Sequence, residues 1–156
     1  MSWTDGLRTS ASGWTILVRL LVGLVVFLPE GMQKLMFPDF LGVGRFARIG
    51  VPVPGFAAPL VGVVEIVCGA LIIIGLFTRL AAVPLIVIMI VALISTKLPI
   101  LVGHDVWIFH LSHEVGRLGF WSAMHEARVD LTMLLACLFL LIVGAGRWSI
   151  DALLTR

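Results

Sequence analysis

The run FAAPLVGVVEIVCGALIIIGLF, residues 56–77, is almost entirely apolar. Its only charged side chain is Glu65. A helix needs about 20 predominantly apolar residues to cross the roughly 30 Å hydrocarbon core of a bilayer, and this run meets that requirement. The stretch therefore predicts a transmembrane helix.

Three further apolar runs accompany it, at about residues 14–28, 80–94 and 129–143. The chain as a whole is 60% hydrophobic and 13% charged, with a mean hydropathy of +1.14. A typical soluble domain is about half apolar and about a quarter charged. We expect an all-α fold, an integral membrane four-helix bundle that forms one transmembrane domain over residues 1–156.

The breaks between these runs predict the connections. Pro29 is expected to break the first span, which then continues as a kinked or interfacial stretch to Phe37. Residues 38–55 are rich in Gly and Pro and predict a loop. Lys97 is expected to end the third span.

The segment between the third and fourth spans is too polar to cross lipid. Over residues 105–118, apolar side chains recur at helical spacing, at Ile108, Leu111, Val115 and Leu118. This pattern predicts a short amphipathic helix that lies at the membrane interface.

The charges exclude one class of partner and suggest an orientation. The 11 Lys and Arg residues and 9 Asp and Glu residues give a net charge of +2 and form no basic cluster, so nucleic acid is not an expected partner. We expect a multi-pass protein of the cell membrane. An even number of spans places both termini on one side of the membrane, together with the 78–79 turn. Arg residues are dense on that side, which favours a cytoplasmic location for it.

Two charges fall in the interior of predicted spans, at Arg19 and Glu65, whereas Asp130 lies at the start of the fourth. A charge at the middle of a membrane helix costs about 2.5–3.5 kcal/mol on insertion scales, so each needs a partner or a water-filled cavity. We expect the two to form an ion pair, because Gly62 and Gly69 share the Glu65 face and permit close helix approach. The pair either serves only to fix the packing of the two helices or lies at the base of a polar pocket.

Other ionisable residues cluster near the expected exits of the spans. Glu30 and Lys34, at i and i+4, either cap the pocket at the interface or form a solvated pair. His125, Glu126 and Asp130 crowd the start of the fourth span, and we expect them to line the same end of the bundle as Lys34. They are candidates for function, with an interfacial anchor as the alternative.

The sequence offers candidate metal ligands but no complete ligand set. The candidates are His110, His113 and Glu114, of which His110 and Glu114 are spaced i, i+4. No H-E-x-x-H motif is present and no third ligand is specified. We therefore assign no metal, and imidazoles that face water are the simpler interpretation.

Several short motifs resemble those of the DoxX family of small four-helix membrane proteins, over about residues 14–152. Residues 31–35, GMQKL, are similar to the family's G-x-x-K-L. Residues 65–79 are similar to its E-x-x-x-G-x-L-x-x-x-G-x-x-T-R stretch, and residues 144–151, GAGRWSID, to its G-x-G-x-x-S-L-D ending. One departure is Lys97, which stands where many members carry a histidine.

The resemblance implies an association with membrane redox processes. Some DoxX-like proteins are subunits of quinone-linked thiosulfate oxidation, and others are described as partners of thiol or superoxide defence enzymes. More distant relatives act as assembly or trafficking factors, so the fold does not define one function.

The preferred hypothesis is a membrane subunit of an oxidoreductase system that binds a quinone or another small hydrophobic cofactor. The pocket is expected between the first, second and fourth helices and open toward the face of Lys34 and His125. A partner redox protein would supply the electrons, and a homo-oligomer is compatible with this hypothesis. No catalytic residue is assigned, and whether the chain is an enzyme stays open.

The alternative is a non-catalytic membrane scaffold or assembly factor. The candidate cofactor-binding residues are Arg19, Glu65, Lys34, Glu30, His125, Glu126 and Asp130.

Overall fold

The computed structural model describes residues 12–111 and 116–155. These residues are helical or irregular, and their only β-type pairing is an isolated bridge between Val106 and Phe109. Three helices are long and apolar enough to cross a membrane, at Thr15–Met36, Pro54–Ile74 and Thr78–Val102. The all-helical fold class predicted from the apolar runs is thereby confirmed.

The first of these helices is continuous through Pro29, and the predicted break there is wrong. It consists of α1 (Thr15–Leu20), the π-helical η2 (Leu21–Phe27) and α2 (Leu28–Met36). Leu28 donates its backbone N–H to the carbonyl of Gly23, five residues earlier. A proline in an α-helix clashes with the carbonyl four residues before it. The wider π turn immediately before Pro29 offers a way to relieve this clash without ending the helix.

The third helix repeats this arrangement. It consists of α5 (Thr78–Ala92), the π-helical η3 (Leu93–Lys97) and α6 (Leu98–Val102). Leu98 donates its N–H to the carbonyl of Leu93, directly before Pro99. Lys97 therefore does not end the helix, contrary to the prediction. Its charge is compensated by an ion pair with α7, described below.

The remaining helices are α3, α4, α7 and α8. The predicted loop at residues 38–55 contains the short α3 (Val43–Arg48). Helix α4 (Pro54–Ile74) corresponds to the predicted second span, and α7 (Phe120–Val143) begins well before the predicted residue 129. A last short helix, α8 (Ile150–Leu154), follows α7.

The predicted interfacial helix is not present in the described part of residues 105–118. Residues 105–111 form a turn closed by the bridge between Val106 and Phe109. The Asp105 carboxylate accepts a hydrogen bond from the N–H of Leu111 at 2.7 Å and contacts Nδ1 of His110 at 3.0 Å. An acidic side chain that bonds to nearby backbone stabilises a turn in competition with a helix.

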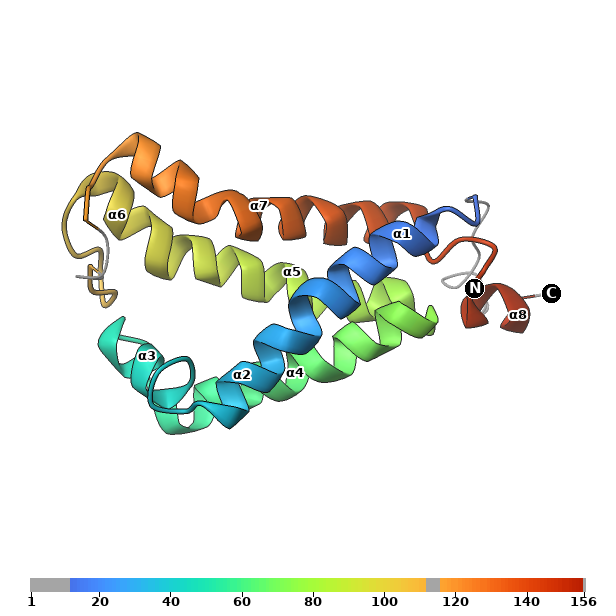
Figure 1. The fold of residues 1–156 in the computed structure, drawn as a ribbon, viewed down its shortest axis with the longest axis horizontal. Coiled ribbons are helices and arrows are strands. Elements are labelled where there is room, and N and C mark those ends of the chain that lie inside the picture. The colour runs from blue at the N-terminus through green and yellow to red at the C-terminus, as the bar shows by residue number, and fades with distance from the viewer. Residues whose placement is uncertain (1–11, 112–115, 156) are drawn as a thin grey trace.

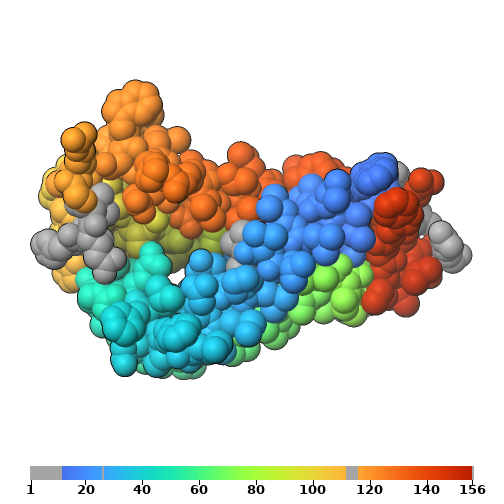
Figure 2. Space-filling model, in the orientation of Figure 1, coloured from blue at the N-terminus to red at the C-terminus, as the bar shows by residue number. Residues whose placement is uncertain are grey.

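The helices pack as two pairs that diverge from one end (Figure 1). The first helix packs against α4, and the Thr78–Val102 helix packs against α7. The pairs meet where α1 begins and α8 lies, and they separate toward α3 and α6 (Figure 1). In the space-filling view, the surface is hollowed between α3 and the first half of α7 (Figure 2). The apolar core includes Val22, Phe27, Ile72, Leu85, Cys137 and Leu140.

Glycines let the first helix touch α4. A Cβ atom on Gly31 would lie 2.6 Å from the carbonyl oxygen of Gly62, and one on Gly23 would lie 2.5 Å from that of Gly69. Real Cβ atoms do not approach a backbone oxygen so closely. The two backbones are therefore in contact, and this contact places α2 directly beside Glu65.

Candidate functional site: charged residues between the helices

Glu65 is the one charged residue of α4, and it is deeply buried. It is 1% exposed and lies ten residues before Gly75, the C-terminal cap of α4, so it is about 15 Å from that end of the helix. Nζ of Lys34 lies 2.7 Å from Oε2 of Glu65. Because an unpaired buried charge is costly, this close pairing explains how a carboxylate is retained in an apolar helix.

Lys34 also connects Glu65 with the surface. Its Nζ lies 3.4 Å from Oε2 of Glu30, one turn earlier in α2, and the Glu30 side chain is 50% exposed. Lys34 itself is 12% exposed. The three residues form a continuous charged chain from the middle of α4 to the surface, which we call the Glu30–Lys34–Glu65 chain.

Arg19 lies elsewhere, and the predicted ion pair between Arg19 and Glu65 is wrong. The guanidinium donates to the carbonyls of Ile72 and Ile73 in the last turn of α4. It also donates to the carbonyls of Ala145 and Trp148, after α7. The last carbonyls of a helix lack intrahelical partners and carry partial negative charge, so a cation is favourable there. Ile72 is seven residues beyond Glu65, about 10 Å along the helix.

Asp151 is a buried charged residue that the sequence analysis missed. It is 3% exposed and accepts hydrogen bonds from the backbone N–H groups of Phe77 at 2.7 Å and Thr78 at 3.0 Å. These groups begin α5, whose N-cap residue Phe77 has a left-handed φ of 49° and no side-chain cap of its own. Asp151 therefore caps α5 from a distant part of the chain. The only sequence signal was its place in the C-terminal G-x-G-x-x-S-L-D resemblance.

The charged start of α7 divides into two groups. Asp130 lies 3.4 Å from Nζ of Lys97, and this ion pair joins α7 to η3. His125 and Glu126 are exposed, and both ring nitrogens of His125 lie within hydrogen-bond distance of Nη1 of Arg128. Within residues 12–111 and 116–155, no hydrogen bond or ion pair joins these α7 side chains to Lys34 or Glu65.

Of the three metal candidates, only His110 is among the described residues. His110 contacts Asp105 at 3.0 Å on the surface, and His113 and Glu114 lie outside the described residues. In the described part of the chain, no group of three or more His, Cys, Asp or Glu side chains could hold a metal ion.

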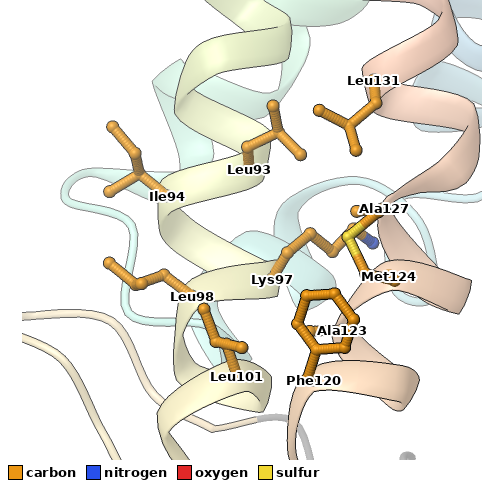
Figure 3. Close-up of a pocket in the computed structure, with 10 residues that line it drawn as sticks. All are labelled: Leu93, Ile94, Lys97, Leu98, Leu101, Phe120, Ala123, Met124, Ala127 and Leu131. Carbon is orange, nitrogen blue, oxygen red and sulfur yellow. The ribbon is translucent and has the colours of Figure 1, made fainter.

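A cavity of about 300 Å³ lies between the third helix and α7 (Figure 3). Its position differs from that of the predicted pocket, because neither Lys34 nor Glu65 lines it. Lys97 is its one charged lining residue. The lining residues are Leu93, Ile94, Lys97, Leu98, Leu101, Phe120, Ala123, Met124, Ala127 and Leu131.

Comparison with known proteins agrees with the motif resemblance. The DoxX family model matches residues 14–98. A protein of Mycobacterium tuberculosis, named only as an uncharacterised membrane protein, is 50% identical over 155 residues, which cover 99% of this chain and 90% of the relative. No solved structure matches the chain significantly. The matched residues include the first helix, α4 and the third helix up to Leu98, and with them Arg19, Lys34 and Glu65. The chain is a membrane protein and belongs to the DoxX family.

Proposed function

We propose that this protein is a membrane subunit of an oxidoreductase system and that it binds a quinone or another small hydrophobic cofactor within the membrane. The observation that carries the proposal is the Glu30–Lys34–Glu65 chain, because it connects a fully buried carboxylate with the surface. Charged groups inside a membrane span are costly, and those retained commonly mark a proton or ligand path.

The proposal includes a four-span topology. Helix α7 packs along the third helix over α5, η3 and α6, which supports an equal depth in the bilayer (Figure 1). Its apolar part, residues 129–143, is the fourth span, and the Lys97–Asp130 pair neutralises the charge at its start. The start of α1 and the end of α7 then lie on one side of the cell membrane, which we assign to the cytoplasm.

Proton transfer is the role of the Glu30–Lys34–Glu65 chain. Reduction of a quinone to a quinol consumes two electrons and two protons. The Lys34 ammonium contacts both carboxylates, so a proton can pass between Oε2 of Glu65 and Oε2 of Glu30 through Nζ. Positioned carboxylates and lysines are common general acids and bases. A partner redox protein supplies the electrons in this proposal.

The set of cofactor-binding residues is narrower than the sequence suggested. Lys34 and Glu65 remain as groups that contact or protonate the cofactor, and Glu30 links them to water. Arg19 is removed from the set, because four backbone carbonyls accept its hydrogen bonds. His125 and Glu126 face outward and suit a role toward the partner protein.

Lipid extraction from the purified protein tests the proposal. The protein is purified in mild detergent, and the bound lipids are analysed for quinones. The expected result is one quinone equivalent fewer in Glu65→Gln than in the wild-type protein, with no loss in Glu126→Gln, because Glu126 is exposed on α7. A stoichiometric membrane protein without any quinone would contradict the proposal and support a scaffold or assembly factor.

A further inference from the structure

The cavity between the third helix and α7 forms a second site, separate from the Glu30–Lys34–Glu65 chain. Its walls come from η3 and α6 on one side and from the first three turns of α7 on the other (Figure 3). None of Glu30, Lys34 and Glu65 lines it. A volume of about 300 Å³ is at the lower end of the range found for small-molecule sites.

Small side chains leave this space open. Ala123 and Ala127 on α7 face the cavity and are each 5% exposed, where larger residues would fill the gap between the helices. Across from them, η3 adds a π turn at Leu93–Lys97. The walls are otherwise apolar, so a ligand must bury a hydrocarbon surface there.

Lys97 is the polar feature of this cavity. Its side chain is 13% exposed and extends from the third helix toward α7, beside Ala127 (Figure 3). Within the described chain, its Nζ has one charged neighbour, Oδ2 of Asp130 at 3.4 Å, and makes no hydrogen bond. An ammonium group carries three N–H donors. Donors in an apolar cavity without an acceptor are unfavourable, so this group favours a ligand that brings an acceptor oxygen.

The charges decide which kind of oxygen fits. Asp130 already neutralises Lys97, so the pair has no net charge. A carboxylate or phosphate placed on Lys97 would lie close to the Asp130 carboxylate and be repelled by it. A neutral carbonyl oxygen accepts the same hydrogen bond without this repulsion.

We propose that the cavity binds a neutral, lipid-soluble molecule whose carbonyl oxygen accepts a hydrogen bond from Nζ of Lys97. Such a carbonyl is present in a quinone ring and in the ester group of a bilayer lipid. Phe120, Met124 and Leu101 line the cavity and are 57%, 43% and 43% exposed, which provides a lateral entrance from the interfacial region of the bilayer. This binding proposal does not depend on the function proposed above, because it requires neither electron transfer nor a partner.

Ligand-induced stabilisation in detergent tests the proposal. A ligand that binds only the folded protein raises the unfolding temperature with increasing concentration, and the increase yields an affinity. The neutral quinone probe is decylubiquinone, the neutral ester probe is a diacylglycerol, and the anionic probe is oleate. We expect at least one neutral probe to bind and oleate to bind at least about tenfold more weakly, because the Asp130 carboxylate repels the anion.

Two variants address the two features of the site. Ala127→Leu fills the cavity and leaves every charge in place, whereas Leu135→Phe enlarges an exposed side chain of the same helix and serves as its control. Lys97→Met with Asp130→Asn removes the ammonium donors without leaving a stranded charge. We expect Ala127→Leu and the double variant each to weaken the neutral probe about tenfold or more, and Leu135→Phe to leave its affinity unchanged.

The pattern across the probes identifies the source of the carbonyl. Preference for decylubiquinone indicates a quinone, and preference for the diacylglycerol indicates a bilayer lipid. Stronger binding of oleate than of both neutral probes would overturn the charge argument. Equal affinities in the wild-type protein, Ala127→Leu and the double variant would overturn the site itself.

Discussion

The Lys34 ammonium on α2 and the Glu65 carboxylate on α4 lie 2.7 Å apart, and this ion pair joins the first helix to the second. The contact requires that the first helix continue past Pro29, because Lys34 lies in its last turn. It also requires the close approach of Gly31 and Gly62. A helix break, a bulky residue or a lost charge at these positions would therefore disrupt the Lys34–Glu65 ion pair.

Lys34→Gln and Glu65→Gln should be strongly coupled. Lys34→Gln strands the buried Glu65 carboxylate and should lower the free energy of unfolding by about 3–5 kcal/mol. Glu65→Gln leaves Lys34 paired with Glu30 and should cost less. The double change should cost less than the sum of the two. Unfolding in mixed micelles with increasing denaturing detergent measures this. Glu30→Gln is the control, since its side chain is half exposed and should change stability by less than about 1 kcal/mol. Additive losses would contradict the pairing.

Arg19→Gln should destabilise the protein independently of Glu65. The change removes the hydrogen bonds to four carbonyls, so we expect a loss of at least about 3 kcal/mol. Arg19→Lys should restore only part of it, because an ammonium lacks the planar fork of guanidinium donors. The losses from Arg19→Gln and Glu65→Gln should add within about 0.5 kcal/mol in the same unfolding assay. A larger coupling energy would show that the two sites communicate.

Gly31→Ala should disturb the contact between α2 and α4. The new Cβ would meet the Gly62 carbonyl oxygen at 2.6 Å, so the helices must separate and the Lys34–Glu65 contact must lengthen. We expect a loss of about 1–3 kcal/mol, the usual cost of overpacking, measured by thermal unfolding in detergent. Gly55→Ala is the matched control in α4, because the Cβ that alanine adds there would meet nothing within 4 Å. Equal stability of both variants would argue against backbone contact.

Asp151→Ala should uncouple the C-terminal segment from the turn before α5. The change leaves the N–H groups of Phe77 and Thr78 without their acceptor, and we expect a loss of about 1–3 kcal/mol. Hydrogen exchange at residues 77 and 78 should become faster. Asp39→Ala, at an exposed position, should alter neither stability nor exchange there. Unchanged protection at both amides would rule out the cap.

Single cysteines at Thr155 and Asp39 should label from opposite sides of the membrane. Thr155 follows α8 at the end where α1 begins, whereas Asp39 lies near α3 at the other end (Figure 1). The native Cys68 and Cys137 are buried and should not react with an impermeant maleimide. Labelling of both sites from the same side would exclude the four-span topology.

The apolar runs of the sequence were enough to predict the helical membrane class and the position of α4. These properties depend on local composition: an apolar run longer than the bilayer is thick must form a helix that satisfies its own backbone. The sequence also marked Arg19 and Glu65 as charges that need partners. The sequence pattern predicted wrongly that Pro29 breaks the first helix and that Lys97 ends the third. The π turns η2 and η3 and the ion pair of Lys97 with Asp130 depend on how the helices pack, which the local pattern does not show.

Which charges meet depends on how the helices pack against one another. Arg19 and Glu65 are the obvious pair in the sequence, yet they bind different partners, since the register of the first helix against α4 places Arg19 at the end of α4 and Lys34 beside Glu65. That register depends on the fit of Gly23 and Gly31 against Gly69 and Gly62. Hydropathy carries no information about such an interhelical offset, because every register buries a similar apolar surface, whereas one register brings the glycines and the charges together.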